Sequence, residues 1–266
     1  AQVISQFFAF AMARALRQRP GRRAATRCRP LVLLLSAALV PRGARAGGNA
    51  SLELQWSTPI FAYFVDPVQA AELNRKVLDA ARELRDGSPV GESASNRGGW
   101  QSQRHLHKEG APFSELKKEA VAAANEFWRQ GQLRTAHAKG RAAKPKFFVK
   151  EMWVNVLGAG DSHKVHKHAG SIFAGVYYAS VPPAQPDDPE GGSIKFRDPR
   201  AQTSILEGFE WMGLGADVQV RPSPGLMLVF PGWLDHFVEP VAAAPASWVS
   251  KAEERVAVSF NVGFKT

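Results

Sequence analysis

The sequence predicts an α+β protein that is mainly β, in which a sandwich or barrel of short strands has helices packed on one face. Three observations lead to this fold class. Two apolar stripes at helical spacing precede residue 130, six short segments rich in β-branched and aromatic residues follow Pro145, and turn residues separate those segments. Helices followed by a run of strands are typical of α+β architectures.

The first element in the chain, residues 1–46, is predicted to be a cleaved targeting segment. Read from Met12, it has an arginine-rich stretch, an apolar run over 31–40 and a small-x-small sequence at 44–46. This order is typical of a secretory signal, so we expect the ER lumen or secretion; plastid or mitochondrial transit peptides are also arginine-rich and acid-free. The apolar run is half of the roughly 20 residues that a membrane span needs, so no stable span is expected.

The net charge of +10 belongs almost entirely to the targeting segment. Residues 1–46 contain nine arginines and no lysine or acidic residue, and removing those nine charges leaves +1 for residues 47–266. A nucleic-acid-binding surface needs its Lys and Arg on the folded domain, so we expect no nucleic-acid partner. The only cysteine, Cys28, lies in the same segment, which argues against a disulfide framework and a cysteine-type zinc site.

Residues 47–266 are predicted to form one domain that begins with a strand over 54–65. Asp66 then caps a helix that has Pro67 at its first position and runs to about residue 85. The apolar stripe of this helix comprises Ala70, Leu73, Val77, Ala80 and Leu84. A second amphipathic helix is expected over 113–128, with the stripe Phe113, Leu116, Ala120, Ala123 and Phe127.

Six strands are predicted in the second half of the chain. Turn residues bound each segment, and the longest turn contains four prolines and the pair Gly191-Gly192. The predicted strands cover 146–157, 171–180, 193–198, 217–222, 225–230 and 254–264.

Three histidines form the candidate metal site. His166 and His168 are two residues apart, so they share a face in an extended strand, and His236 follows the strand over 225–230. Three protein ligands leave coordination positions open, as in non-haem iron sites that bind a co-substrate and dioxygen, although imidazole suits zinc equally. The alternative is a solvated histidine pair beside Lys164 and Lys167.

The other histidines are expected to lie on the surface, outside the site. These are His105, His107, His137 and His163. The nearby acids are Asp161 and Asp235, and neighbouring residues in an extended chain point in opposite directions, so Asp235 points away from His236. We therefore favour His168 as the third ligand.

Arg255 is the candidate anion-binding residue. It opens the last predicted strand, where period two places Arg255, Ala257 and Ser259 on one side of the chain. An arginine that points into a small barrel needs an anionic partner, and the far carboxylate of a metal-bound dicarboxylate would provide one. The alternative is a surface pair with Glu253 or Glu254.

Several motifs resemble one known family. They are WVNVLGAGDSHKVHKHAGSIFAGVYYASVP (153–182), GLMLVFPGWLDHFVEP (225–240) and ERVAVSFN (254–261), with SNRGGWQS (95–102) upstream. Together they resemble the iron- and 2-oxoglutarate-dependent oxygenases, and more narrowly the family named putative 2OG-Fe(II) oxygenase. The resemblance covers about Leu54 to Lys265. It implies a double-stranded β-helix, or jelly roll, with supporting N-terminal helices.

The resemblance also implies roles for individual residues. His166 takes the place of the first iron ligand and His236 that of the distal histidine, with His168 as the third ligand. Arg255 and Ser259 resemble the pair that binds the far carboxylate of 2-oxoglutarate. Tyr178 resembles a tyrosine that assists there, with Tyr177 as the alternative, and Asn155 either touches the co-substrate or caps its strand.

The implied activity is that of an Fe(II)- and 2-oxoglutarate-dependent dioxygenase. Such an enzyme hydroxylates its substrate, here a small molecule or peptide, and releases succinate and CO2. The superfamily has HxD or HxE where this chain has His166-Lys167-His168. Two alternatives therefore stay open: a three-histidine iron dioxygenase that does not use 2-oxoglutarate, and a non-catalytic jelly-roll binding module.

Overall fold

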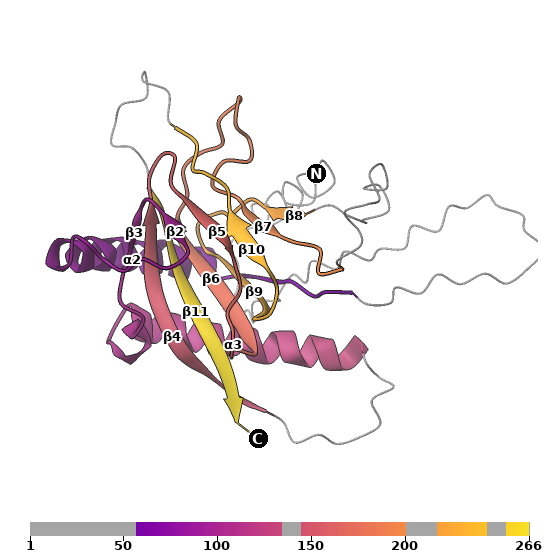
Figure 1. Cartoon of the computed structure of the whole chain (residues 1–266). Coiled ribbons are helices and arrows are strands. Elements are labelled where there is room, and N and C mark those ends of the chain that lie inside the picture. Colours follow the sequence, from indigo (N-terminus) through magenta and orange to yellow (C-terminus); the bar gives the residue numbers. More distant parts are fainter. Residues whose placement is uncertain (1–56, 135–144, 201–216, 244–253, 266) are drawn as a thin grey trace, which may run out of the picture.

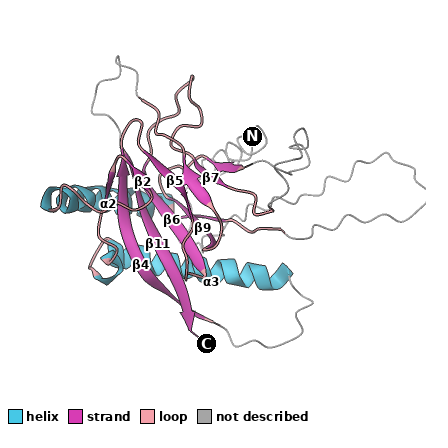
Figure 2. Ribbon diagram, viewed as in Figure 1, coloured by secondary structure: helices cyan, strands magenta, loops and turns pink. Residues whose placement is uncertain are grey.

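The computed structural model describes residues 57–134, 145–200, 217–243 and 254–265. Within them it contains two antiparallel sheets and two α-helices (Figures 1 and 2). The mainly β architecture of two sheets confirms the predicted fold class. The predicted targeting segment, Cys28 and His137 lie outside the described residues, and no helix among the described residues is long and apolar enough to span a membrane.

The larger sheet has six strands in the order β1-β9-β6-β11-β4-β3. Its centre is formed by long antiparallel strands, and β4 and β11 pair along almost their full length, as Figure 1 shows. The strand bounds are β1 Phe61–Phe64, β3 Trp100–Gln101, β4 Lys146–Leu157, β6 Phe173–Ser180, β9 Leu226–Pro231 and β11 Arg255–Lys265.

The smaller sheet has five short strands in the order β2-β5-β10-β7-β8. The bounds are β2 Asn96–Arg97, β5 Ser162–His166, β7 Ile194–Phe196, β8 Val218–Val220 and β10 His236–Val238. Each of the six segments predicted as strands contains one, whereas β2, β3, β5 and β10 were not predicted. The two strands that carry the candidate histidines, β5 and β10, are thus among those that the sequence patterns missed.

Two helices pack against the larger sheet. Helix α2 (Pro67–Gly87) begins at Asp66, whose carboxylate accepts hydrogen bonds from the backbone amides of Val68 at 3.1 Å and Gln69 at 3.4 Å. Helix α3 (Phe113–Arg134) contacts strands β4, β9 and β11. The five residues of its predicted apolar stripe are all buried. The loop between the helices holds β2, β3 and a short 3-10 helix, Leu106–Lys108.

The alternating strands serve two cores. On β11, Val256, Val258 and Phe260 belong to the core between the larger sheet and the helices. Ala257, on the opposite side, packs in a second core between the two sheets, together with Tyr178 and Phe230. The period-two prediction for β11 is therefore correct, and the inward residues of this strand face the smaller sheet.

The predicted first strand is too long. Of residues 54–65, strand β1 covers Phe61–Phe64, and Ser57–Ile60 are not in a strand. Strand β9 offers pairing partners only from Leu226 to Val229. Pro59 lacks a backbone N–H and cannot extend the hydrogen-bond ladder, which explains why the apolar run is longer than the strand.

Candidate metal and anion site

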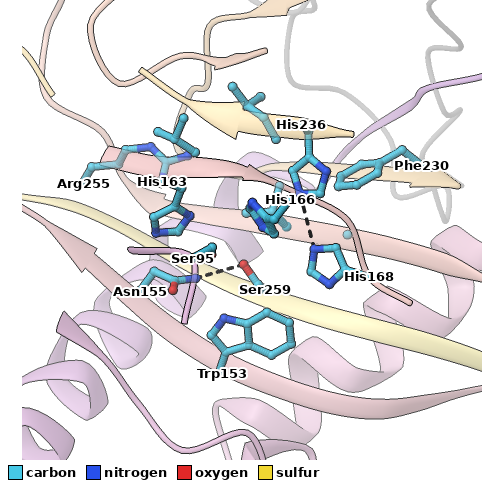
Figure 3. Close-up of a pocket in the computed structure, with 14 residues that line it drawn as sticks. Ser95, Trp153, Asn155, His163, His166, His168, Phe230, His236, Arg255 and Ser259 are labelled. Atoms are coloured by element: carbon cyan, nitrogen blue, oxygen red, sulfur yellow. Dashed lines mark hydrogen bonds between the residues drawn. The ribbon is translucent and has the colours of Figure 1, made fainter. Parts of the chain in front are cut away.

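Three imidazoles meet between the sheets at the end of the smaller one. His166 ends β5, His236 begins β10, and the two are directly opposite each other in the antiparallel pair. His168 follows β5 in a loop that is held by the hydrogen bond from its backbone N–H to Gly232 O at 2.8 Å. One ligand nitrogen from each histidine lies within 4.8 Å of the other two (Figure 3). The expectation that His166 and His168 share a strand is wrong, because the strand ends at His166.

Backbone hydrogen bonds fix which nitrogen of two rings faces the site. Nδ1 of His166 lies 2.7 Å from Lys164 O, and Nδ1 of His236 lies 2.9 Å from Leu234 O. A carbonyl oxygen only accepts, so each Nδ1 carries the hydrogen and each Nε2 keeps a free lone pair. This is the arrangement in which backbone carbonyls orient metal-binding histidines.

The spacing of the Nε2 atoms fits a bound cation. Nε2 of His168 lies 3.3 Å from Nε2 of His236, and the two rings are nearly parallel at 6°. Because Nε2 of His236 has a lone pair, either an N–H of His168 or a cation lies between the two nitrogens. Metal–nitrogen bonds of about 2.0–2.1 Å that meet at about 90–110° separate two nitrogens by about 2.9–3.4 Å. The spacing of this pair therefore fits two ligands of one divalent metal ion, and the third histidine offers its ligand nitrogen within 4.8 Å of both.

Burial keeps these imidazoles neutral. It lowers the pKa of His168 to about 4, with the neighbouring His166 contributing, and lowers the pKa of His166 below its ordinary value. The pKa of His236 is also well below the ordinary value, mainly through burial. Neutral imidazole is the form that binds metals, so at neutral pH no proton has to leave before an ion binds.

Arg255 lies at the other end of the same cavity. Only 2% of its surface is exposed, and its Nε donates a hydrogen bond to Gly192 O at 3.0 Å. The guanidinium carbon lies 5.0 Å from the centre of the Tyr178 ring. Among the described residues no acid pairs with Arg255, and Glu254, the suggested surface partner, instead pairs with Arg85 at 2.7 Å. Burial lowers the pKa of Arg255, but a guanidinium stays charged, so the cavity contains an uncompensated cation.

The remaining predicted residues surround this cation. Asn155 and Ser259 line the cavity, and Nδ2 of Asn155 donates to Oγ of Ser259 at 3.0 Å. Tyr178 does not line the cavity; it lies behind Arg255, and burial raises its pKa to about 12. The hydroxyl of Tyr177 donates to Asn74 Oδ1 on α2 at 2.6 Å, so Tyr178 is the inward-facing tyrosine of the pair.

His163 lines the cavity although the sequence predicted a surface position. Its exposed fraction is 9%, and its Nε2 has no hydrogen-bond partner in the described part of the chain. His236 pairs with His166 and Val238 with His163, so β5 carries one residue more than β10 between these pairs. This β-bulge lets both His163 and His166 point inward, which strict alternation forbids. His107 is also buried, contrary to prediction, but does not line the cavity.

Trp153 and Ser95 also line the cavity and were not predicted. The Trp153 ring stacks on His168 with centroids 5.8 Å apart, and the Arg104 guanidinium lies 5.0 Å from the Trp153 ring. The cavity volume is about 30 Å³, and the cavity opens to solvent at its mouth. None of its lining residues is acidic. Figure 3 shows the three ligand histidines at one end and Arg255 with His163 at the other.

Comparison with known proteins confirms the family resemblance. Residues 151–261 match the family described as putative 2OG-Fe(II) oxygenase, and this range contains the three candidate ligand histidines and Arg255. A search of curated proteins found no match.

Solved structures with similar folds include several oxygenases. A prolyl-4-hydroxylase from Pseudomonas putida is 16% identical, with a TM-score of 0.46, and the similarity covers 77% of this chain and 93% of that one. HygX from Streptomyces hygroscopicus, solved with nickel and 2-oxoglutarate, is 14% identical, with a TM-score of 0.44 and coverage of 77% and 82%. Since these TM-scores are below 0.5, the family resemblance rests on the match over residues 151–261 and on the site.

Proposed function

We propose that this chain is an Fe(II)- and 2-oxoglutarate-dependent dioxygenase that hydroxylates a small molecule or peptide and releases succinate and CO2. One observation carries the proposal: three neutral imidazoles and one unpaired buried guanidinium face the same cavity from opposite ends. A metal ion and a dicarboxylate are the two ligands that these ends would bind together.

The residues divide between metal and co-substrate. His166, His168 and His236 would hold the iron, with the backbone carbonyls of Lys164 and Leu234 fixing the orientation of two of these rings. Arg255 would bind the far carboxylate of 2-oxoglutarate, and dioxygen would be the second co-substrate.

Three further residues support the co-substrate end. The Asn155–Ser259 pair presents polar atoms to the chain of the bound acid, and Tyr178 supports the Arg255 guanidinium from behind. Iron and 2-oxoglutarate bound in this way supply the oxidative chemistry, in which the 2-oxo acid loses CO2 and becomes succinate as dioxygen is reduced. The protein orients both carboxyl ends and keeps bulk water from the buried cation.

Anaerobic titration followed by exposure to air tests the proposal. We expect the protein to bind one Fe(II) and to develop a weak visible charge-transfer band when 2-oxoglutarate is added, and to release succinate after air is admitted. His236→Ala should abolish both signals, whereas His105→Ala, at an exposed position outside the cavity, should retain them. Bound iron without a band or succinate would contradict the proposal, and a protein that retains no iron would favour a passive binding module.

A second candidate is a three-histidine iron dioxygenase that does not use 2-oxoglutarate. It is favoured by the donor set itself, which contains three imidazoles and, in the described part of the chain, no carboxylate. This candidate predicts that Arg255→Ala leaves both iron binding and oxygen consumption intact. The 2-oxoglutarate-dependent enzyme predicts that the same variant keeps its iron and loses oxygen consumption.

We also propose that residues 1–46 direct the protein into the secretory pathway. The order of basic stretch, apolar run and small-x-small sequence supports this route. Sequencing the N-terminus of protein recovered from the culture medium or from membrane-enclosed compartments would test it. A mature terminus near Gly47 in the ER lumen or medium is the expected result, and recovery from mitochondria or plastids would contradict it.

A further inference from the structure

His163 is a buried polar side chain that the proposed reaction leaves without a role. It lines the cavity at the end where Arg255 lies, as Figure 3 shows. It does not belong to the group of three histidines whose ligand atoms converge. The β-bulge in β5 turns it inward, and pairing on both sides, with Asn96 of β2 and Val238 of β10, holds that strand in place.

The ring of His163 offers a hydrogen bond that no described residue takes. Its Nε2 is buried and unpartnered. Burial lowers the pKa of His163 to about 3, and the positive charge of Arg255 acts in the same direction, so the ring is neutral and carries one N–H donor. A buried polar atom without a partner costs free energy, which a ligand with a suitable acceptor would recover.

The surroundings of His163 favour an anionic acceptor. Arg255 contributes a full positive charge, Ser95, Asn155 and Ser259 contribute polar atoms, and no acidic residue lines the cavity. Asn155 uses one of its two amide hydrogens on Ser259, and the serine hydroxyls keep their own O–H donors. To these neutral groups His163 adds a buried ring nitrogen that has no partner among the described residues.

We propose that His163 donates a hydrogen bond to the same far carboxylate that Arg255 binds, and so makes the cavity select dicarboxylic 2-oxo acids over 2-oxo acids with an uncharged chain. The inference rests on the proposed function and adds a residue that positions the co-substrate. Arg255 contributes the positive charge and His163 contributes a directional hydrogen bond. These two donors, on strands β11 and β5, fix both oxygens of one carboxylate.

Three variants of His163, one control variant and two ligands test this inference. Ni(II) replaces iron so that no turnover occurs, and calorimetry measures the Kd of 2-oxoglutarate and of 2-oxopentanoate, which has the same carbon chain without the far carboxylate. His163→Phe keeps a ring and removes both nitrogens, His163→Leu removes the ring as well, and His163→Gln keeps an N–H donor. His107→Phe is the matched control, since His107 is equally buried and lies outside the cavity.

We expect His163→Phe or His163→Leu to raise the Kd of 2-oxoglutarate about 10- to 150-fold, as the loss of a hydrogen bond to a charged group does. The Kd values of 2-oxopentanoate and Ni(II) should change less than about twofold, His163→Gln should recover most of the loss, and His107→Phe should bind like wild type.

Three results would overturn the inference. An unchanged Kd for 2-oxoglutarate would show that His163 makes no contact with it, and equal losses for both ligands would show a general change of shape. Weaker Ni(II) binding would make His163 a metal ligand. Failure of wild type to bind 2-oxoglutarate while it holds Ni(II) is a different result, which removes the proposed co-substrate itself.

Discussion

Arg255→Met separates what Arg255 does for ligand binding from what it does for the fold. The variant removes the buried charge and keeps a side chain of similar length. The guanidinium loses its hydrogen bond to Gly192 O, about 1.5–3 kcal/mol, and its contact with the Tyr178 ring, about 1–2 kcal/mol. Against these losses, the variant removes the desolvation cost of an unpaired ion, several kcal/mol, and buries an apolar chain worth about 1.5–3 kcal/mol.

These contributions nearly cancel or favour the variant. We expect Arg255→Met without 2-oxoglutarate to be as stable as wild type or up to about 2 kcal/mol more stable, which corresponds to a Tm at most about 8 °C higher. A substitution that stabilises the ligand-free protein indicates that the original residue is retained for binding and not for stability.

The ligand should reverse this advantage. At a concentration of 2-oxoglutarate 100 times the wild-type Kd, wild type gains about 2.7 kcal/mol. Losing one partner of a buried charge pair costs about 2–5 kcal/mol in affinity, so the variant should gain less than about 1 kcal/mol. Scanning calorimetry of the Ni(II)-loaded proteins should therefore show the difference in Tm moving by about 4–10 °C in favour of wild type when the ligand is added.

Two results would refute this reasoning. A variant that melts well below wild type without ligand would mean that Arg255 has a structural partner that offsets its burial. A variant that gains as much Tm from 2-oxoglutarate as wild type would mean that the carboxylate binds elsewhere in the cavity.

Three further predictions concern the metal site and the packing around it. His168→Ala should weaken Ni(II) binding, measured by calorimetry, more than about 100-fold. Losing a residue that only hydrogen-bonds to a metal ligand costs about 10- to 100-fold, and losing a ligand itself should cost more. The control His105→Ala, at an exposed position, should bind Ni(II) normally. Burial lowers the pKa of His168 from 6.5 to about 4 and that of His163 to about 3. Below pH 6.5 the unfolded chain therefore binds protons that the folded chain does not, which lowers the stability of the folded state. The Tm of the metal-free protein should be maximal above pH 6.5 and fall steadily towards pH 4. Gly175→Ala should lower the free energy of unfolding, measured with denaturant, by about 1–3 kcal/mol, because the added Cβ would overlap the Phe260 ring. Gly131→Ala should raise it by about 0.5–1 kcal/mol, because this position is exposed on α3 and an added Cβ would meet no neighbouring atom within 4 Å.

Period alone predicted the parts of the fold that are long and well buried. Strands β4 and β11 each run for more than ten residues, so their alternation is clear from the sequence. Alternation placed Arg255 on one side of its strand, and the neighbouring candidate histidines favoured the inner side over a surface pair. The two helices were predicted because their apolar residues recur at helical spacing. The first strand was predicted too long, through an apolar run that Pro59 interrupts. The segments 193–198 and 217–222 were also predicted too long, since each contains a strand of three residues.

The short strands of the site carry no such signal. Strand β5 reads Ser-His-Lys-Val-His, with Val165 exposed and the histidines inward, the reverse of an ordinary apolar alternation. The bulge that turns His163 inward depends on pairing with β10, which is about 70 residues away in the chain, and His168 is placed by a hydrogen bond to Gly232 O. Sequence spacing could predict which three histidines come together but not the strand geometry that unites them.

The charges in the cavity support the proposal that a metal ion at one end and an anion at the other bind together. A divalent ion held by three neutral imidazoles would keep its charge of +2, and Arg255 adds one more positive charge, while no acidic residue lines the cavity. Asp161 is occupied elsewhere, accepting a hydrogen bond from the Gly158 amide at 2.8 Å. Three positive charges in a low-dielectric enclosure repel one another unless an anion enters. A dicarboxylate that spanned the cavity would place one negative charge at each end, so a donor set of three imidazoles is compatible with the proposed anionic co-substrate.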